Sequence, residues 1–125
     1  MLSNLEFEES LPKKRMGAGC LIFYEGGHLL LLKPKYKPVW EIPGGITEQN
    51  ESPKGCCQRE VKEEIGLEHE IGKLLAIDYN SRTEQKTESL MFIFYGGILS
   101  QIEIAEIQVQ SNEISIFGFF TRETL

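Results

Sequence analysis

Four carboxylates along residues 45–67 are spaced in a pattern that could bind a metal ion. Glu60, Glu63 and Glu64 stand at positions i, i+3 and i+4, and a fourth carboxylate, Glu51, precedes them. On a helix of 3.6 residues per turn, this spacing places the three on one face, where like charges repel unless a cation lies among them. Oxygen donors of this kind suit Mg²⁺, which binds a few carboxylates and keeps positions for water and substrate phosphate.

The residues around these carboxylates predict the helix that holds them. Ser52 and Pro53 form an N-cap and first-turn pair, and Gly66 lies where a helix commonly ends with a left-handed residue. The helix is therefore expected to run from about 53 to 65. Its other side carries apolar residues that would anchor it on a core, namely Cys56, Cys57, Val61 and Ile65.

The segment from Gly45 to Leu67 resembles the Nudix box, G-x5-E-x7-R-E-U-x-E-E-x-G-U, in which U is a bulky aliphatic residue. Every fixed position of that pattern agrees, including Glu51, Arg59 and Gly66. A Glu-rich run by itself usually marks a solvated helix face, but a plain surface helix would not require these glycines in register. The resemblance therefore implies a MutT-like Nudix hydrolase.

The Nudix family hydrolyses nucleoside diphosphates linked to a further group, using bound Mg²⁺ or Mn²⁺ and a water that attacks phosphorus. By position in the box, Glu60 and Glu64 are expected as the main metal ligands, with Glu63 ligating directly or through water. The family also tends to use the carbonyl of the first glycine of the box, here Gly45. One of these glutamates, or a later one, should deprotonate the water. Glu113 is the later candidate, with an ordinary loop residue as the alternative.

Arg59 has two interpretations. Its guanidinium could bind a substrate phosphate, yet its place beside Glu60 and one helical layer from Glu63 favours a structural role. The fixed fork of donors can hold carboxylates in orientation, and Glu51 at the helix entrance is an expected partner. Glu51 is then either that partner or an outer metal ligand.

A proline-interrupted segment at 33–40 is expected as a loop across one end of the sheet. Lys35 could meet substrate phosphates there, and the ring of Tyr36 could stack on a base, although a solvated loop is the alternative. Trp40 either stacks a base or packs against the protein. Arg82, in a polar stretch further on, is an equally open anion contact.

The remaining pattern predicts a mixed sheet. Apolar runs at 16–24 and 28–33 flank a Glu-Gly-Gly turn, which predicts a β-hairpin. Further strands are expected at 73–80, 88–99 and 114–120. With the box helix these elements give an α+β chain. The resemblance implies the Nudix fold, an α/β/α sandwich with a mixed β-sheet and the Nudix-box loop–helix–loop.

Length and composition narrow the class of protein. The 125 residues fit a single Nudix domain over 1–125, with a final helix that is either short or truncated. The net charge of −6 argues against nucleic acid as a partner. No run reaches signal-peptide length or the roughly 20 apolar residues of a membrane span, which predicts a soluble cytoplasmic protein without a membrane partner. Three cysteines without zinc spacing are expected to be reduced and buried.

The substrate is not written in the box. Adenosine-diphosphate-ribose hydrolases of the family typically carry a proline at a position that falls near Arg82 here, and the dinucleoside polyphosphate group expects a tyrosine where this chain has Thr83. A nucleoside triphosphate or another nucleotide derivative therefore stays open as the small-molecule substrate. The alternative is a non-catalytic Nudix-fold module that senses a nucleotide. Many relatives dimerise, so a homodimer is also open, although no dimer interface can be identified from the sequence.

Overall fold

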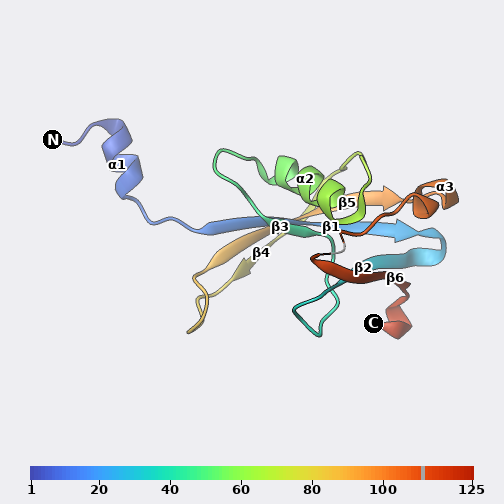
Figure 1. Cartoon of the computed structure of the whole chain (residues 1–125). Coiled ribbons are helices and arrows are strands. Elements are labelled where there is room, and N and C mark those ends of the chain that lie inside the picture. Colours follow the sequence, from blue (N-terminus) through green and yellow to red (C-terminus); the bar gives the residue numbers. More distant parts are fainter. Residues whose placement is uncertain (111) are drawn as a thin grey trace.

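The computed structural model describes residues 1–110 and 112–125 and is built on one mixed β-sheet (Figure 1). The main path of the sheet runs β4-β5-β1-β2-β6, and the short β3 pairs with β1 beside this path. β1 and β5 are parallel, whereas the other pairs are antiparallel. The strands are β1 (Arg15–Tyr24), β2 (His28–Pro34), β3 (Gly44–Ile46), β4 (Leu74–Asn80), β5 (Ser89–Ile98) and β6 (Ile114–Phe120).

The predicted hairpin and strands are confirmed to within one or two residues at each end. β1 and β2 pair antiparallel across the Glu-Gly-Gly turn. Gly26 and Gly27 have φ angles of 78° and 77°, a conformation that glycine adopts without steric strain. The chain therefore has the α+β architecture that the sequence predicts.

The predicted box helix is α2 (Pro53–Ile65). The side chain of Ser52 accepts a hydrogen bond from the backbone N–H of Gly55, and Gly66 ends the helix with a φ of 74°. The apolar side of α2 is buried and packs on β1 in one core cluster, which includes Ala18, Cys20, Ile22, Cys56, Cys57, Val61 and Ile65. One side of α2 is therefore fixed to the sheet, and its glutamates lie on the remaining sides.

Two short helices were not anticipated, although each has a sequence signal. α1 (Asn4–Ser10) and α3 (Gln101–Ala105) each start at a capping box, in which an N-cap serine and a glutamate three residues later bond reciprocally to the backbone. α1 stands clear of the sheet beyond the start of β1 (Figure 1). Where a short final helix was expected, the chain forms a 3₁₀ turn at Arg122–Thr124.

Two further observations concern the predictions on membrane-spanning segments and on the cysteines. Across residues 1–110 and 112–125, no helix is long and apolar enough to cross a membrane. The thiols of Cys20, Cys56 and Cys57 are buried and form no disulfide.

Candidate active site

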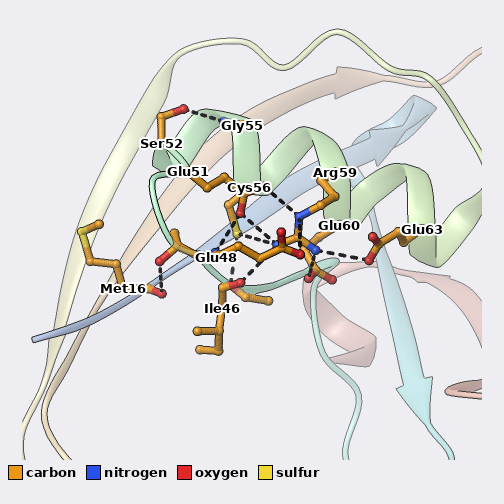
Figure 2. Close-up of polar contacts among 12 residues, drawn as sticks. Met16, Ile46, Glu48, Glu51, Ser52, Gly55, Cys56, Arg59, Glu60 and Glu63 are labelled. Carbon is orange, nitrogen blue, oxygen red and sulfur yellow. Dashed lines mark hydrogen bonds and ion pairs between the residues drawn. The ribbon is translucent and has the colours of Figure 1, made fainter.

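Arg59 is surrounded by carboxylates from α2 and from the loop before it (Figure 2). Its Nε and Nη2 donate to the two carboxylate oxygens of Glu51, at 2.7 and 2.9 Å. Its Nη1 donates to Glu60 Oε1 at 2.8 Å and to Glu63 Oε2 at 3.3 Å. The guanidinium lowers the pKa of Glu51 to about 2, and the carboxylates raise the pKa of Arg59. The structure thus brings these four box residues together, with Arg59 facing carboxylates.

The carboxylate of Glu60 lies directly against the backbone of Gly45. A Cβ atom added to Gly45 would be 2.5 Å from Glu60 Cδ and 2.6 Å from its Oε1. Only a glycine therefore leaves room for this carboxylate beside the Gly45 backbone. The thiol of Cys56 donates to the Gly45 carbonyl oxygen at 3.5 Å, which places that carbonyl at the start of α2.

We expect Gly45→Ala to misplace the Glu60 carboxylate without unfolding the protein, since the clash falls on the far end of a side chain. A misplacement of about 1 Å near reacting groups lowers turnover by about 100-fold. Steady-state hydrolysis and a thermal melt of the same preparation would check this. As a control, Gly27→Ala meets no atom within 4 Å but must hold a φ of +77°, so it should affect the melt and spare turnover. Full turnover in Gly45→Ala would contradict the role given to this contact.

Glu64 is the most buried carboxylate of the group. Its Oε1 accepts a hydrogen bond from the backbone N–H of Gly44 at 2.7 Å. Burial raises the pKa of Glu64 to about 8, and the nearby carboxylates of Glu60, Glu113 and Glu41 add to the shift. Burial also raises the pKa of Glu60, although Arg59 opposes the effect. Burial is thus the largest cause of the raised pKa of both carboxylates.

The residues fit a divalent cation, judged by the chemistry of their donors. Within the described ranges, no three carboxylate, imidazole or thiol side chains converge into a complete cage by themselves. Mg²⁺, however, is bound by one or two carboxylates and fills its other positions with water and substrate phosphate. The carbonyl of Gly45 and the carboxylates of Glu60 and Glu64 are hard oxygen donors of that kind. The carboxylate of Glu63 is half exposed and could add a ligand through water.

The pKa of Glu64 predicts how the stability of the metal-free protein depends on pH. Because the pKa of about 8 in the folded state lies above the value of about 4.3 for an unfolded chain, the native state holds an extra proton between these pH values. The resulting stabilisation is fully present below about pH 4 and is lost as the pH rises through 8.

In EDTA, we therefore expect Glu64→Gln to melt higher than the wild type at about pH 9, by roughly 5 °C, and the difference to shrink at about pH 5. Thermal melts followed by circular dichroism would measure both curves. Glu68→Gln is the matched control, because this exposed carboxylate is paired with Lys62 on the surface. Parallel curves for Glu64→Gln and the wild type would contradict the raised pKa.

A cleft of about 760 Å³ opens beside Glu64, whereas its described lining does not include Glu60 or Glu63. Glu64 and Gly45 contribute to one wall, and Glu113 reaches the cleft from the loop before β6. The backbone N–H of Lys35 donates to the carbonyl of Glu113 at 2.9 Å, which ties the two loops together. The structure thus brings Glu113 and Glu64 to one cavity, although they are far apart in the sequence.

The expected substrate contacts are only partly found at the cleft. Tyr36 lines it, whereas the described lining does not include Lys35, Trp40 or Arg82. Trp40 packs edge-on against Phe120 with ring centroids 4.9 Å apart, which is the packing alternative for this residue.

Three cationic side chains line the cleft. They are Arg15, Lys37 and Lys86. Arg15 is held in place by Thr87, because its Nε donates to Thr87 Oγ1 and its Nη2 to the Thr87 carbonyl, both at 2.7 Å. The parallel pairing of β1 with β5, in which Arg15 pairs with Ser89, brings Arg15 beside residue 87.

Comparison with known proteins identifies the family. Diphosphoinositol polyphosphate phosphohydrolase 2 of Rattus norvegicus is 37% identical over 97 residues, which cover 75% of this chain and 49% of that protein. The chain thus spans about half the length, 49%, of this curated relative. The crystal structure of a MutT NUDIX hydrolase from Burkholderia pseudomallei superposes with a TM-score of 0.76 at 24% identity, covering 91% of this chain and 88% of that one.

The crystal structure of a UDP-X diphosphatase also has a TM-score of 0.76, at 25% identity, and covers 100% of this chain and 62% of that one. These likenesses agree with the mixed sheet and the box helix described above. The family model of the NUDIX domain matches residues 13–125, a range that includes α2 and every strand of the sheet. The chain therefore belongs to the NUDIX family.

Proposed function

We propose that this chain is a pyrophosphohydrolase that uses water to cleave a phosphoanhydride bond in a nucleoside diphosphate linked to another group. One observation carries the proposal. The half-buried carboxylate of Glu64 lies at a cleft whose lining also includes Gly45 and cationic side chains such as Arg15. A site that places oxygen donors for a metal beside cations for phosphate suits this reaction. Nudix hydrolases generally use divalent cations, and we propose Mg²⁺ here, with Mn²⁺ as a substitute.

In this mechanism Glu60, Glu64 and the Gly45 carbonyl would hold the cation, and Glu63 would add a ligand directly or through water. The cation supplies positive charge that offsets the charge of the pyrophosphate and makes water more acidic. Arg59 keeps the Glu60 carboxylate in one orientation through its 2.8 Å hydrogen bond. Glu113 faces the cleft from a separate loop and is our candidate for the group that takes the proton from the attacking water.

The charge of the cleft supports a nucleotide-type substrate. The cationic side chains Arg15, Lys37 and Lys86 share the lining with the carboxylates Glu41, Glu64 and Glu113. Lys37 is already paired with Glu41 at 2.9 Å. Few cations therefore remain for a densely phosphorylated substrate of the kind that the name of the rat relative describes. A substrate with two or three phosphates and a ring for Tyr36 to contact matches the lining better.

The composition and the family match support proposals on the domain organisation, the type of substrate and the cellular compartment. We propose that the chain works as a single Nudix domain, supported by the match over residues 13–125. The net charge of −6 supports a small-molecule substrate over nucleic acid. The buried, unpaired thiols suit the reducing environment of the cytoplasm.

The test is a substrate panel assayed with Mg²⁺, with Mn²⁺ and with EDTA. It should include nucleoside triphosphates, nucleoside diphosphate sugars, dinucleoside polyphosphates and a diphosphorylated inositol phosphate. We expect release of phosphate, pyrophosphate or a nucleotide from a nucleotide member, with incorporation of ¹⁸O from labelled water. Tight nucleotide binding with no hydrolysis under any divalent cation would instead favour the non-catalytic sensing module. Hydrolysis that persists undiminished in EDTA would contradict the metal assignment.

A further inference from the structure

The chain that follows α3 is bonded to the C-terminal end of the box helix. The last carbonyl groups of a helix have no partner within the helix and need one from outside. The backbone N–H of Gln108 donates to the carbonyl of Ile65 at 2.9 Å, and that of Gln110 donates to the carbonyl of Glu64 at 3.2 Å. We call residues 106–110 the closing segment. It is attached to the turn of α2 that carries Glu64.

The closing segment also fixes the backbone of Glu113. The carbonyl of Gln110 accepts hydrogen bonds from the N–H of Glu113 at 3.0 Å and from that of Ile114 at 2.8 Å. Gln110 therefore connects the backbone of Glu64 to the backbone of Glu113. These are two of the carboxylates that line the cleft.

The last glycine of the box allows the closing segment to approach α2. Gly66 has a φ of 74°, and a Cβ atom added to it would be 3.2 Å from the Gln108 carbonyl oxygen and 3.4 Å from the Gln108 Cβ. Ile107 is buried in the core, and Ile104 and Val109 pack against that core. The closing segment thus lies directly against the end of α2.

A side-chain contact outside the cleft holds α3, the helix from which the closing segment starts. His69, in the loop after α2, has a side chain that is 14% exposed. Its Nδ1 lies 3.3 Å from Glu103 Oε2, and its Nε2–H donates to the carbonyl of Gly96 in β5. The second oxygen of Glu103 accepts from the N–H of Ser100 in the capping box of α3. The imidazole therefore ties α3 to β5 and to the loop after the box helix.

We propose that His69 is a positioning residue, which holds α3 and the closing segment against the end of α2 and so sets Glu113 beside Glu64 in the cleft. The described lining of the cleft does not include His69, so its effect passes through Glu113. The inference rests on the proposed function, in which Glu113 takes the proton from the attacking water. Proton transfer requires hydrogen-bond distance, so a small shift of the acceptor slows the step.

Amide hydrogen exchange followed by NMR tests the positioning without substrate or metal. In His69→Ala, we expect the amides of Gln108 and Gln110 to exchange about 10-fold faster than in the wild type, because the closing segment opens locally more often. The amide of Cys20, which donates to the Pro43 carbonyl, reports on the sheet and should change less. Unchanged exchange at Gln108 and Gln110 would overturn the inference.

The other histidine of the sequence provides the matched control. His28 begins β2, and its Nδ1 contacts the Glu25 carbonyl within the hairpin turn. His28→Ala removes an imidazole of the same size, and we expect it to leave exchange at Gln108 and turnover unchanged. A His28→Ala effect as large as that of His69→Ala would show a general loss of stability and would overturn the inference.

Steady-state kinetics test whether His69 acts through Glu113. His69→Ala should lower kcat by about 10-fold with little change in KM. Glu113→Gln should lower kcat by about 100-fold. Adding His69→Ala to Glu113→Gln should cause no further loss, because no proton acceptor is left to position. Losses that multiply in the double variant would overturn the inference.

Variants of Glu103 test the same contact from α3, and they replace His69→Ala if its thermal melt shows that it is unfolded. Glu103→Gln keeps an oxygen for the Ser100 N–H and offers an amide N–H to the Nδ1 of a neutral ring. We expect it to retain the exchange and kcat of the wild type, whereas Glu103→Ala should resemble His69→Ala. Equal losses in the two Glu103 variants would overturn the inference.

A failure of the proposed function would give a different result. A wild type that hydrolyses no member of the panel would refute that function, and the exchange at Gln108 and Gln110 would still decide the positioning. If the wild type hydrolyses a nucleotide and Glu113→Gln keeps full turnover, the role of Glu113 and this inference would both be wrong, while the reaction itself would stand.

Discussion

Replacing Glu64 with glutamine is expected to lower turnover by roughly 10³-fold while leaving the fold intact. The amide keeps an oxygen that can accept the 2.7 Å hydrogen bond from the Gly44 N–H, so the local backbone is undisturbed. It removes the negative charge that a divalent cation requires. Steady-state hydrolysis of the best nucleotide of the panel, over a range of Mg²⁺ concentrations, would measure the loss. The same variant should be more stable than the wild type at high pH, because it no longer buries an ionised carboxylate.

Two comparisons sharpen this experiment. Glu60→Gln should lose turnover to a similar extent, since the Glu60 carboxylate lies against the backbone of Gly45. Glu68→Gln, an exposed carboxylate just past the helix, should retain full turnover. If Glu60→Gln and Glu64→Gln both retained full turnover with Mg²⁺, the proposed metal site would be wrong.

Arg59→Ala is expected to lower both stability and turnover. The guanidinium bonds to Glu51, Glu60 and Glu63 at 2.7 to 3.3 Å, and its removal leaves these carboxylates to repel one another. We expect the melting temperature to fall by roughly 5–10 °C and turnover to fall by about 100-fold. Circular dichroism melts and steady-state kinetics on one preparation would measure both.

Matched variants separate the two interpretations of Arg59. Lys62→Ala removes an exposed cation from the same helix, and such a surface pair contributes little. Arg59→Lys keeps the charge but cannot bridge several carboxylates, so it should recover stability more than turnover. A rise in KM with unchanged kcat in Arg59→Ala would instead indicate that Arg59 binds a substrate phosphate.

Much of the fold could be predicted because its signals are local. The bounds of α2 follow from Ser52, Pro53 and Gly66, and the hairpin follows from apolar runs beside a Glu-Gly-Gly turn. The short helices could have been found from their capping boxes, which begin at Ser3 and Ser100. The strand order could not, because it depends on packing between distant segments. In particular, nothing near β1 in the sequence indicates that it pairs in parallel with β5.

The residues of the candidate site likewise include some that could be placed from local sequence and some that could not. The box residues are close in sequence, so helix geometry was enough to place Glu60, Glu63 and Glu64 around one side of α2. The substrate contacts come from separate loops, and their assignment depends on which loops meet. Trp40 is an example. Its indole packs against Phe120, which lies near the other end of the sequence, so the contact could not be predicted from neighbouring residues. Arg15 shows the converse, because pairing with Thr87 brings it to the cleft.

The link between Arg15 and Thr87 has a consequence for how substrate specificity can change between proteins of this fold. The wall of the cleft at residues 81–87 is attached through β1 and β5, whereas the oxygen donors are carried by α2 and β3. The two parts belong to different segments of the chain. Residues of the loop can therefore be exchanged without moving the donors. Grafting this loop between relatives is accordingly a rational route to new specificities on one unchanged catalytic scaffold.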